Sequence, residues 1–242
     1  MDRINIIIMA GGLGKRMNSS IPKVLHKINK KPMIVNIIET VSTLNINRIF
    51  IVVGKFKDII KKTIEEYIIS DLIEYVLQEE AFGTGHAIQC CYNNILLNHK
   101  FKTLILSGDV PLIKKNTIKD MIELNSECLL LTAKLDNPYG YGRIIREKNN
   151  FLKIQEEKDC TENEKKICEI NAGIYLIQSG YIIGNILNIT NDNNQKEYYL
   201  TDLFRILKEK NINIDTLKIN ESENYQIKGV NTIDQLKELE KI

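Results

Sequence analysis

The sequence lacks the features of a membrane-spanning or secreted protein. No apolar run approaches the length needed to cross a bilayer, and the run from Ile4 to Met9 is too short for a signal peptide. An excess of one charge is also missing, because 33 basic and 31 acidic residues give a formal net charge of +2. This balance gives no general attraction to nucleic acid or to membrane surfaces. We therefore expect a cytoplasmic protein that binds neither.

Patterns of metal-binding and nucleophilic residues are missing as well. The five cysteines form no Cys-x-x-Cys pair and no zinc-ligand spacing, and their surroundings favour buried thiols in a reducing compartment. His26, His86 and His99 also lack metal-ligand spacing, so we interpret them as structural or surface residues. No Ser-His-Asp set or close carboxylate pair is evident, which argues against hydrolysis through a covalent intermediate.

The N-terminal stretch runs from an apolar segment into a glycine-rich loop that contains Gly11, Gly12 and Gly14. An unbroken apolar run is typical of a buried parallel strand, and backbone N–H groups in a glycine loop can surround an anion. The loop is not a Walker A motif, because no Gly-Lys-Ser/Thr follows. It also differs from the dinucleotide motif, because Met17 stands where the third glycine belongs. The bare pattern leaves phosphate binding and a packing turn about equally open.

Positive charge lies beside this loop. Lys15, Arg16 and Lys23 follow within a few residues, and the planar fork of arginine suits phosphate while lysine supplies a mobile point charge. The loop also lies at the carboxyl end of a predicted strand, which is where open α/β sheets bind their ligands. The stretch therefore predicts a site for a polyphosphate, a small anionic ligand.

The rest of the chain predicts an α/β fold. Strands expected over residues 4–9, 49–53, 73–77, 103–106 and 128–133 alternate with helices, one of them over residues 86–97, which is typical of a helix-covered parallel sheet. After residue 140 the pattern changes to a hairpin over residues 140–155, a charged loop over 159–166, strands over 170–177 and 214–219, and helices that include 198–210. Thr232 and Gln235 are spaced as a capping box for a short final helix. We expect one Rossmann-like domain over residues 1–242, with a mostly parallel mixed sheet covered by helices and a small β insertion.

Asp109 follows a predicted strand directly after Ser107 and Gly108. A carboxylate at this end of a strand can hold Mg²⁺, which takes one or two protein ligands together with substrate phosphates. The alternative is an aspartate that caps the following turn.

Two further groups of polar residues are candidates for ligand binding. Gly83-Thr84-Gly85 would let the backbone approach a flat base, and Gln78 offers a paired donor and acceptor; alternatively, Thr84 is an ordinary helix N-cap. Other polar residues at strand ends or turns could bind the hydroxyls of a sugar, although each alone is more often a turn residue. They are Gly140, Tyr141, Gly142, Arg143, Glu156, Asn171 and Asn231.

These residues belong to an ordered series of motifs that covers essentially the whole chain. The series is Ala10-Gly11-Gly12-Leu13-Gly14-Lys15-Arg16-Met17, Pro22-Lys23-Val24-Leu25-His26, Gly83-Thr84-Gly85-His86-Ala87, Gly108-Asp109-Val110-Pro111-Leu112, Tyr139-Gly140-Tyr141-Gly142-Arg143-Ile144, Glu169-Ile170-Asn171-Ala172-Gly173-Ile174, Glu197-Tyr198-Tyr199-Leu200-Thr201-Asp202 and Gly229-Val230-Asn231. It resembles the sugar-1-phosphate nucleotidyltransferases, and most closely the uridylyltransferase domain of bacterial bifunctional N-acetylglucosamine-1-phosphate uridylyltransferase. The resemblance implies the nucleotide-diphospho-sugar transferase fold, with a nucleotide-binding part over residues 1–135 and a sugar-binding part with C-terminal helices over 136–242.

The resemblance also implies roles for individual residues. Catalysis would fall to Arg16, Lys23 and Asp109, and Mg²⁺ would be bound by Asp109 and Asn231. The residues implied for nucleotide binding are Ala10, Gly11, Gly12, Gly14, Gln78, Gly83, Thr84 and Gly108. Those implied for the N-acetylglucosamine part are Gly142, Glu156, Asn171, Tyr199 and Thr201.

The implied reaction is Mg²⁺-dependent transfer of UMP from UTP to N-acetylglucosamine 1-phosphate, with release of pyrophosphate. Such transfer depends on alignment and charge stabilisation more than on a protein nucleophile. Two alternatives stay open: the same chemistry on another pair, such as glucose 1-phosphate with UTP or dTTP, or a non-catalytic sugar-nucleotide-binding subunit. A Rossmann dehydrogenase is disfavoured by Met17.

The chain departs from the family pattern at four positions. Lys15 replaces Thr or Ser, Ser107 replaces Tyr, Ala172 replaces Thr and Lys228 replaces Glu. Ser107 and Ala172 would flank the sugar or metal region, so they bear on sugar preference. Hexapeptide repeats of the family's β-helix are missing from this sequence, so we expect no acetyltransferase activity and no trimerisation through that part, and the oligomeric state is left open.

Overall fold

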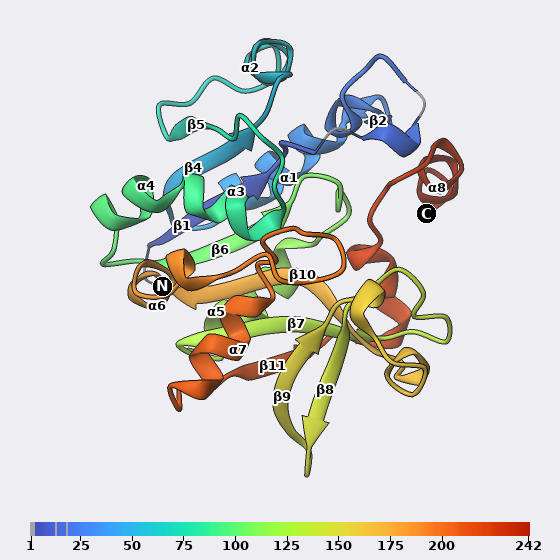
Figure 1. The fold of residues 1–242 in the computed structure, drawn as a ribbon. Helices are drawn as coiled ribbons and strands as arrows, with labels where there is room; N and C mark the ends of the chain where they lie inside the picture. Colours follow the sequence, from blue (N-terminus) through green and yellow to red (C-terminus); the bar gives the residue numbers. More distant parts are fainter. Residues whose placement is uncertain (1–2, 13, 18) are drawn as a thin grey trace.

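The computed structural model describes residues 3–12, 14–17 and 19–242, and this part of the chain is built on one large mixed sheet. Its main path, in spatial order, is β11 (Asp215–Lys218), β7 (Cys128–Lys134), β10 (Glu169–Gln178), β6 (Lys102–Ser107), β1 (Ile4–Met9), β4 (Ile46–Val53) and β5 (Ile73–Leu77). β10 is antiparallel to β6 and β7, whereas the other neighbouring pairs are parallel. The predicted mostly parallel mixed sheet is therefore confirmed (Figure 1).

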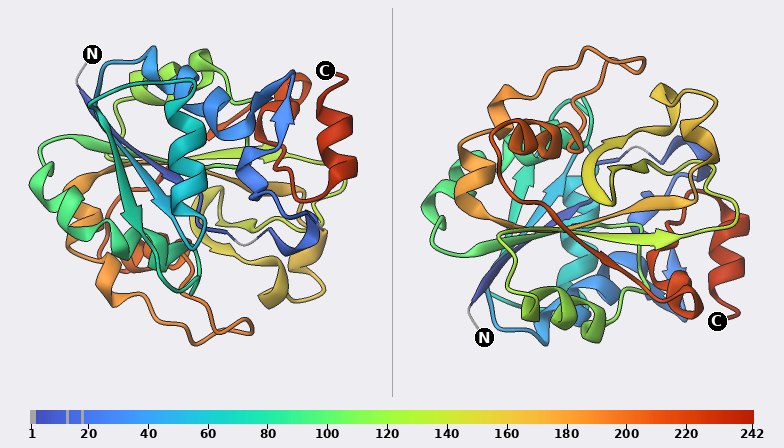
Figure 2. Two further views of the ribbon diagram at one scale, coloured as in Figure 1. Left: turned by 90° about the horizontal axis from the view of Figure 1, so that it is seen from above. Right: turned by 90° about the horizontal axis from the view of Figure 1, so that it is seen from below.

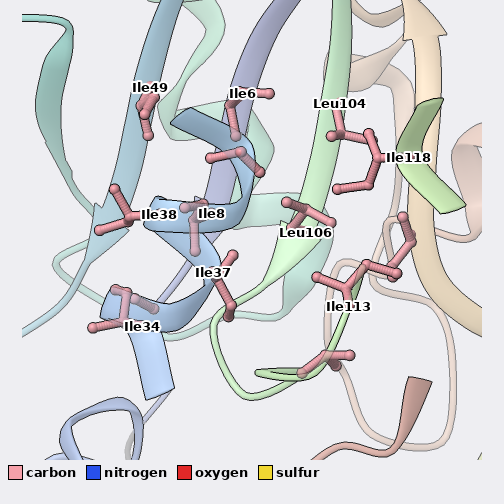
Figure 3. Packing of buried hydrophobic residues seen from close by; sticks show 14 of the residues in the cluster. Ile6, Ile8, Ile34, Ile37, Ile38, Ile49, Leu104, Leu106, Ile113 and Ile118 are labelled. Carbon is pink, nitrogen blue, oxygen red and sulfur yellow. The ribbon is translucent and has the colours of Figure 1, made fainter. Parts of the chain in front are cut away.

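Helices cover both faces of this sheet because successive strand side chains point to opposite sides. Ile6 and Ile8 pack with α1 (Met33–Ser42), α2 (Lys57–Glu65) and α5 (Lys115–Glu123), and Figure 3 shows this layer. Ile7 points to the other face. That face is covered by α3 (Thr84–Cys90), α4 (Tyr92–Leu97), α6 (Ser179–Ile183) and α7 (Asp202–Glu209). Fully buried strands explain the unbroken apolar runs in the sequence.

A hairpin of β8 (Arg143–Glu147) and β9 (Asn150–Gln155) joins the sheet beside β10 and projects away from it (Figure 1). Its turn uses Lys148 and Asn149, both with positive φ angles. The predicted hairpin is confirmed. The predicted charged loop that follows it contains two short 3₁₀ turns, Glu157–Asp159 and Glu164–Lys166.

Two predicted helices differ from the observed ones. The helix expected over residues 86–97 is two helices, α3 and α4, separated at Cys91. The helix expected over residues 198–210 begins only at Asp202, because the backbone groups of Tyr198 form hydrogen bonds with another segment of the chain. Its N–H donates to Phe82 O at 2.7 Å, and its carbonyl accepts from Gly85 N at 2.7 Å. Tertiary hydrogen bonds therefore override the local helical pattern.

The last helix, α8 (Ile233–Leu239), packs on the segment that follows the glycine loop (Figure 2). A small apolar cluster joins residues from both ends of the chain, namely Met17, Ile28, Met33, Val230, Leu236 and Leu239. Arg16 and Asn231 are sequence neighbours of two members of this cluster, so the cluster fixes the backbone on which both stand. In the ranges that the structure describes, no helix is long and apolar enough to cross a membrane.

Candidate active site

A cavity of about 530 Å³ opens at the carboxyl ends of β1, β5 and β6. Open α/β sheets bind ligands at this edge. The cavity is lined by Met9, Gly11, Gly12, Gly14, Arg16, Lys23, Val24, Gln78, Ala81, Gly83, Thr84, Ala87, Ser107, Asp109 and Glu197. Most residues proposed from the sequence for nucleotide binding and catalysis therefore share one cavity.

At one side of the cavity, Asp109 and Asn231 converge on two cationic side chains. Lys23 Nζ forms an ion pair with Asp109 Oδ2 and donates to Asn231 Oδ1 at 3.3 Å. Arg16 Nη2 donates to the same Asn231 oxygen at 3.2 Å. The three segments that supply these four residues are far apart in the sequence and meet only in the fold.

The position of Asp109 is determined by several hydrogen bonds. Gly108 N donates to Met9 O at 2.9 Å, which ties the end of β6 to the end of β1. Val230 N donates to Asp109 O at 2.9 Å, and Ser107 Oγ donates to Asp109 Oδ1 at 2.6 Å. Asp109 Oδ2 is thus the carboxylate oxygen that faces Lys23. Ser107, which we expected from the sequence to flank the sugar or metal region, is thus a direct contact of this carboxylate.

The chemistry of these donors fits Mg²⁺. A carboxylate and an amide oxygen are hard ligands, and both contact the same cation here, the Lys23 ammonium group. Among the described residues, no group of three or more His, Cys, Asp or Glu side chains could hold a metal. A site with so few protein ligands suits Mg²⁺, which usually keeps water and substrate phosphates as its remaining ligands.

The opposite side of the cavity is formed by Gln78 and the loop before α3. Gln78 is 5% exposed, and its Nε2 donates to Gly83 O at 3.1 Å. Gly83 has φ +113°, and a Cβ added there would lie 2.5 Å from Tyr198 O. This close approach between the two backbones explains why glycine is needed at this position.

Thr84 has a role that the sequence did not predict. The interpretation as a helix N-cap is wrong, because Gly83 is the N-cap of α3 and no side-chain cap is formed. Instead, Thr84 Oγ1 accepts from Leu200 N at 3.1 Å. Thr84 therefore joins the start of α3 to the segment that leads into α7.

The residues predicted for the sugar form a second group beside the cavity. Thr201 Oγ1 donates to Glu156 Oε1 at 2.8 Å, and a Cβ added at Gly142 would lie 3.6 Å from Glu156 Oε2. Asn171 N donates to Gly142 O at 2.9 Å, and Tyr199 OH accepts from Gln195 Nε2 at 2.9 Å. These residues are close to one another, but none is among those that line the 530 Å³ cavity.

Glu156 carries the electrostatic signature of this group. Burial raises the pKa of its carboxyl group, and the carboxylates of Asp202, Asp159 and Glu197 raise it further, while the hydrogen bond from Thr201 opposes the shift. A carboxyl group held in acidic surroundings can exchange between accepting and donating hydrogen bonds.

Ala172 does not flank the site as predicted. Its side chain packs in the core cluster that contains Ile170 and Ile174, which β-strand alternation places opposite Asn171. Asn171 points to the other face, where its Nδ2 donates to Tyr175 OH at 2.7 Å. Lys228 is exposed, and the side chain of Lys15 lies outside the part that the structure describes.

The site combines a glycine loop, two cationic side chains and a pair of side-chain oxygens, which is the kind of arrangement that phosphoryl-transfer enzymes use. A protein-family profile described as a MobA-like NTP transferase domain matches residues 6–150. A protein of Acanthamoeba polyphaga mimivirus, named "Probable UDP-N-acetylglucosamine pyrophosphorylase", is 42% identical over 246 residues, which cover 99% of this chain and 96% of the relative. The chain belongs to this family of nucleotidyltransferases.

Further similarity extends to larger proteins and to a solved structure. The bifunctional protein GlmU of Thermosipho melanesiensis is 44% identical over 97% of this chain and 49% of its own length. The chain thus spans about half the length of the bifunctional relatives that it matches. A solved UDP-glucose pyrophosphorylase in complex with UDP-glucose has a TM-score of 0.76 at 17% identity, covering 99% of this chain and 98% of that one. This last similarity concerns the fold alone.

Proposed function

We propose that this protein is an N-acetylglucosamine-1-phosphate uridylyltransferase, a UDP-N-acetylglucosamine pyrophosphorylase. The proposal is supported by the mimivirus relative, which matches this chain over nearly the full length of both proteins. The observation that carries it is the convergence of Arg16, Lys23, Asp109 and Asn231 at one side of a glycine-lined cavity.

The reaction is an in-line displacement at phosphorus. A phosphate oxygen of N-acetylglucosamine 1-phosphate attacks the α-phosphorus of UTP, and the bond from that phosphorus to the bridging oxygen breaks. Pyrophosphate leaves with the electron pair of that bond, so no proton transfer and no protein nucleophile are required.

Each residue of the site has a role in that displacement. Arg16 and Lys23 bind the triphosphate and stabilise the charge that develops on the departing pyrophosphate. Asp109 and Asn231 hold Mg²⁺, which when bound neutralises phosphate charge and aligns the oxygens. The backbone of Ala10, Gly11, Gly12 and Gly14 follows the phosphates, and Gly108 lets β6 pass close to β1. Gln78, Gly83 and Thr84 form the wall against the base.

The sugar side is assigned to the second group of residues. Gly142, Glu156, Asn171, Tyr199 and Thr201 offer hydrogen-bonding groups beside the cavity, and we assign the N-acetylglucosamine part to them. Residues 1–135 supply the nucleotide half of the site, whereas residues 136–242 supply the sugar half and Asn231.

The experiment is pyrophosphate release with Mg²⁺ from each combination of UTP, dTTP, CTP or GTP with the 1-phosphates of N-acetylglucosamine, glucose and mannose. We expect turnover chiefly with UTP and N-acetylglucosamine 1-phosphate. A preference above about tenfold for another sugar, a difference that a few pocket contacts can supply, would keep the reaction type and overturn the sugar. Tight nucleotide binding by folded protein without any turnover would instead indicate a non-catalytic binding subunit.

A further inference from the structure

The orientation of the Gln78 amide follows from one neighbouring carbonyl group. A backbone carbonyl can only accept a hydrogen bond, so the Gln78 atom that lies 3.1 Å from Gly83 O must be the nitrogen Nε2. With the amide turned over, two oxygens would face each other in a side chain that is 5% exposed. Gly83 O therefore defines which end of the amide faces α3.

The second hydrogen of that nitrogen points to His86. Gln78 Nε2 lies 3.2 Å from His86 Nδ1, and because Nε2 is a donor, Nδ1 must be the acceptor. The imidazole then carries its proton on Nε2, which lies 3.9 Å from Cys90 Sγ. Burial raises the pKa of the Cys90 thiol, so this sulfur is a neutral, weak acceptor that tolerates that proton.

The plane of the imidazole ring is held by aromatic packing. Its centroid lies 5.3 Å from that of Phe82 and 6.2 Å from that of Tyr198, in tilted arrangements. Both neighbours belong to segments that are paired with each other, because Tyr198 N donates to Phe82 O. His86 is thus a fixed acceptor, which agrees with the structural one of the two roles that the sequence left open for it.

These contacts leave Gln78 with one free polar atom at the cavity. Oε1 has no hydrogen-bond partner among residues 3–12, 14–17 and 19–242. It faces the glycine loop so closely that a Cβ added at Gly11 would lie 2.8 Å from it. Both Gln78 and Gly11 line the cavity. The site therefore presents an acceptor, and no donor, from this side chain.

We propose that His86 is a positioning residue that locks the Gln78 amide with Oε1 toward the ligand, and that it thereby selects uracil over cytosine. The inference rests on the proposed function, because it assumes that the base lies against Gln78. Uracil carries a proton on N3 that Oε1 can accept, whereas N3 of cytosine carries a lone pair that repels Oε1. Only the reversed amide would suit cytosine, and reversal would set an oxygen against Gly83 O and break the hydrogen bond to His86 Nδ1 unless the imidazole changed its tautomer.

The test uses two nearly isosteric substitutions of His86. His86→Asn keeps an acceptor oxygen near the place of Nδ1, whereas His86→Leu removes it at almost the same size. Two ratios are measured. The first is kcat/KM for UTP divided by kcat/KM for CTP. The second is the Kd for CTP divided by the Kd for UTP, each determined by calorimetry in the absence of sugar phosphate. We expect His86→Leu to lower both ratios about tenfold, the size of one lost hydrogen bond, and His86→Asn to restore most of the loss.

A double-mutant cycle with Gln78→Ala separates this role from general damage to the fold. If His86 acts through the Gln78 amide, His86→Leu should have no further effect on the UTP to CTP ratio once Gln78 is removed. His99→Leu, at an exposed histidine at the end of α4, is the matched control and should leave both ratios unchanged.

The outcomes distinguish this inference from the proposed function. If the wild-type enzyme prefers UTP and a folded His86→Leu variant has the same UTP to CTP ratio, the role of His86 is contradicted and the proposed function stands. Wild-type enzyme that prefers CTP overturns both. If His86→Leu does not fold, the Asn variant decides: a ratio as low as that of Gln78→Ala contradicts the proposal, and a ratio near wild type supports it.

Discussion

Arg16 and Asn231 lie 215 residues apart in the sequence, yet Arg16 Nη2 donates to Asn231 Oδ1 at 3.2 Å. The contact follows from the apolar cluster beneath it, in which Met17 and Val230 are both buried. Lys23 donates to the same oxygen, so a residue from the last tenth of the chain completes a site that begins in the first. The geometry of this corner leads to four testable predictions, and the buried carboxyl group of Glu156 leads to a fifth.

Asp109→Asn should lower kcat/KM for pyrophosphate formation at least about 100-fold. The substitution keeps the shape of the side chain but removes the charge that we propose to bind Mg²⁺, and charge stabilisation by a metal is worth several kcal/mol. Asp120→Asn, at an exposed carboxylate on α5, is the matched control and should leave the rate unchanged. Activity near wild type in Asp109→Asn would remove this carboxylate from the mechanism.

Arg16→Lys should lower kcat about as much as Arg16→Ala does. We expect each to lower kcat by about 10²-fold or more, the usual cost of one donor that stabilises transition-state charge. Lysine keeps the charge but not the planar fork that contacts Asn231 and that we propose to bind phosphate. Single-turnover kinetics at saturating UTP is the measurement, with Arg48→Lys on β4 as the control. Full activity in Arg16→Lys would reduce the role of Arg16 to simple charge.

Ser107→Ala should raise the Mg²⁺ concentration that gives half-maximal rate about tenfold. The lost hydroxyl donates to Asp109 Oδ1 at 2.6 Å, and partners that orient metal ligands typically contribute 10–100-fold to affinity. Ser107→Thr keeps the hydroxyl and should stay near wild type. Mn²⁺ binding without substrates, followed by electron paramagnetic resonance, gives a readout independent of turnover. An identical metal affinity in the alanine variant would contradict the role.

Gln235→Leu should lower kcat/KM about fivefold, which corresponds to about 1 kcal/mol for one hydrogen bond. Gln235 Oε1 accepts from Asn231 N at 2.7 Å, while Gln235 N donates to the N-cap Thr232 Oγ1 at 3.2 Å. Gln235→Glu retains an acceptor and should retain activity. Glu238→Leu tests a neighbouring exposed position on α8. Equal losses in the Leu and Glu variants at position 235 would show that the hydrogen bond is not the cause.

Glu156→Gln should stabilise the free protein at neutral pH and have little effect below pH 4. The pKa of Glu156 is raised in the folded state by burial and by neighbouring carboxylates, so the folded protein binds the proton more tightly than the unfolded chain does. Stability is therefore lost as the pH rises above the ordinary carboxyl pKa of about 4.3. Glutamine keeps the bond from Thr201 without the charge. Urea unfolding of both proteins from pH 3.5 to 8 measures the difference, which should grow with pH; Glu238→Gln, at an exposed carboxylate, should show no such trend.

Local patterns in the sequence were sufficient to predict the elements that we propose to bind phosphate. The apolar run of β1 and the glycines after it predict a buried strand and a phosphate-approaching loop, because strand burial and glycine geometry are local properties. The strand before Asp109 was predicted for the same reason. The capping box was half right: Thr232 accepts from Gln235 N, but the Gln235 side chain bonds Asn231 N instead of the N-cap.

The tertiary structure alone decided which side chains act together. Nothing near His86 in the sequence indicates that Nδ1 meets Gln78, since the two residues approach only because α3 folds back over the end of β5. Ala172 and Asn171 are adjacent in the sequence but lie on opposite faces of β10, so only one of them reaches the ligand side. The physical reason is that a strand or a helix is specified by neighbours within a few residues, whereas a site is made by contacts between segments that only the packed core brings together.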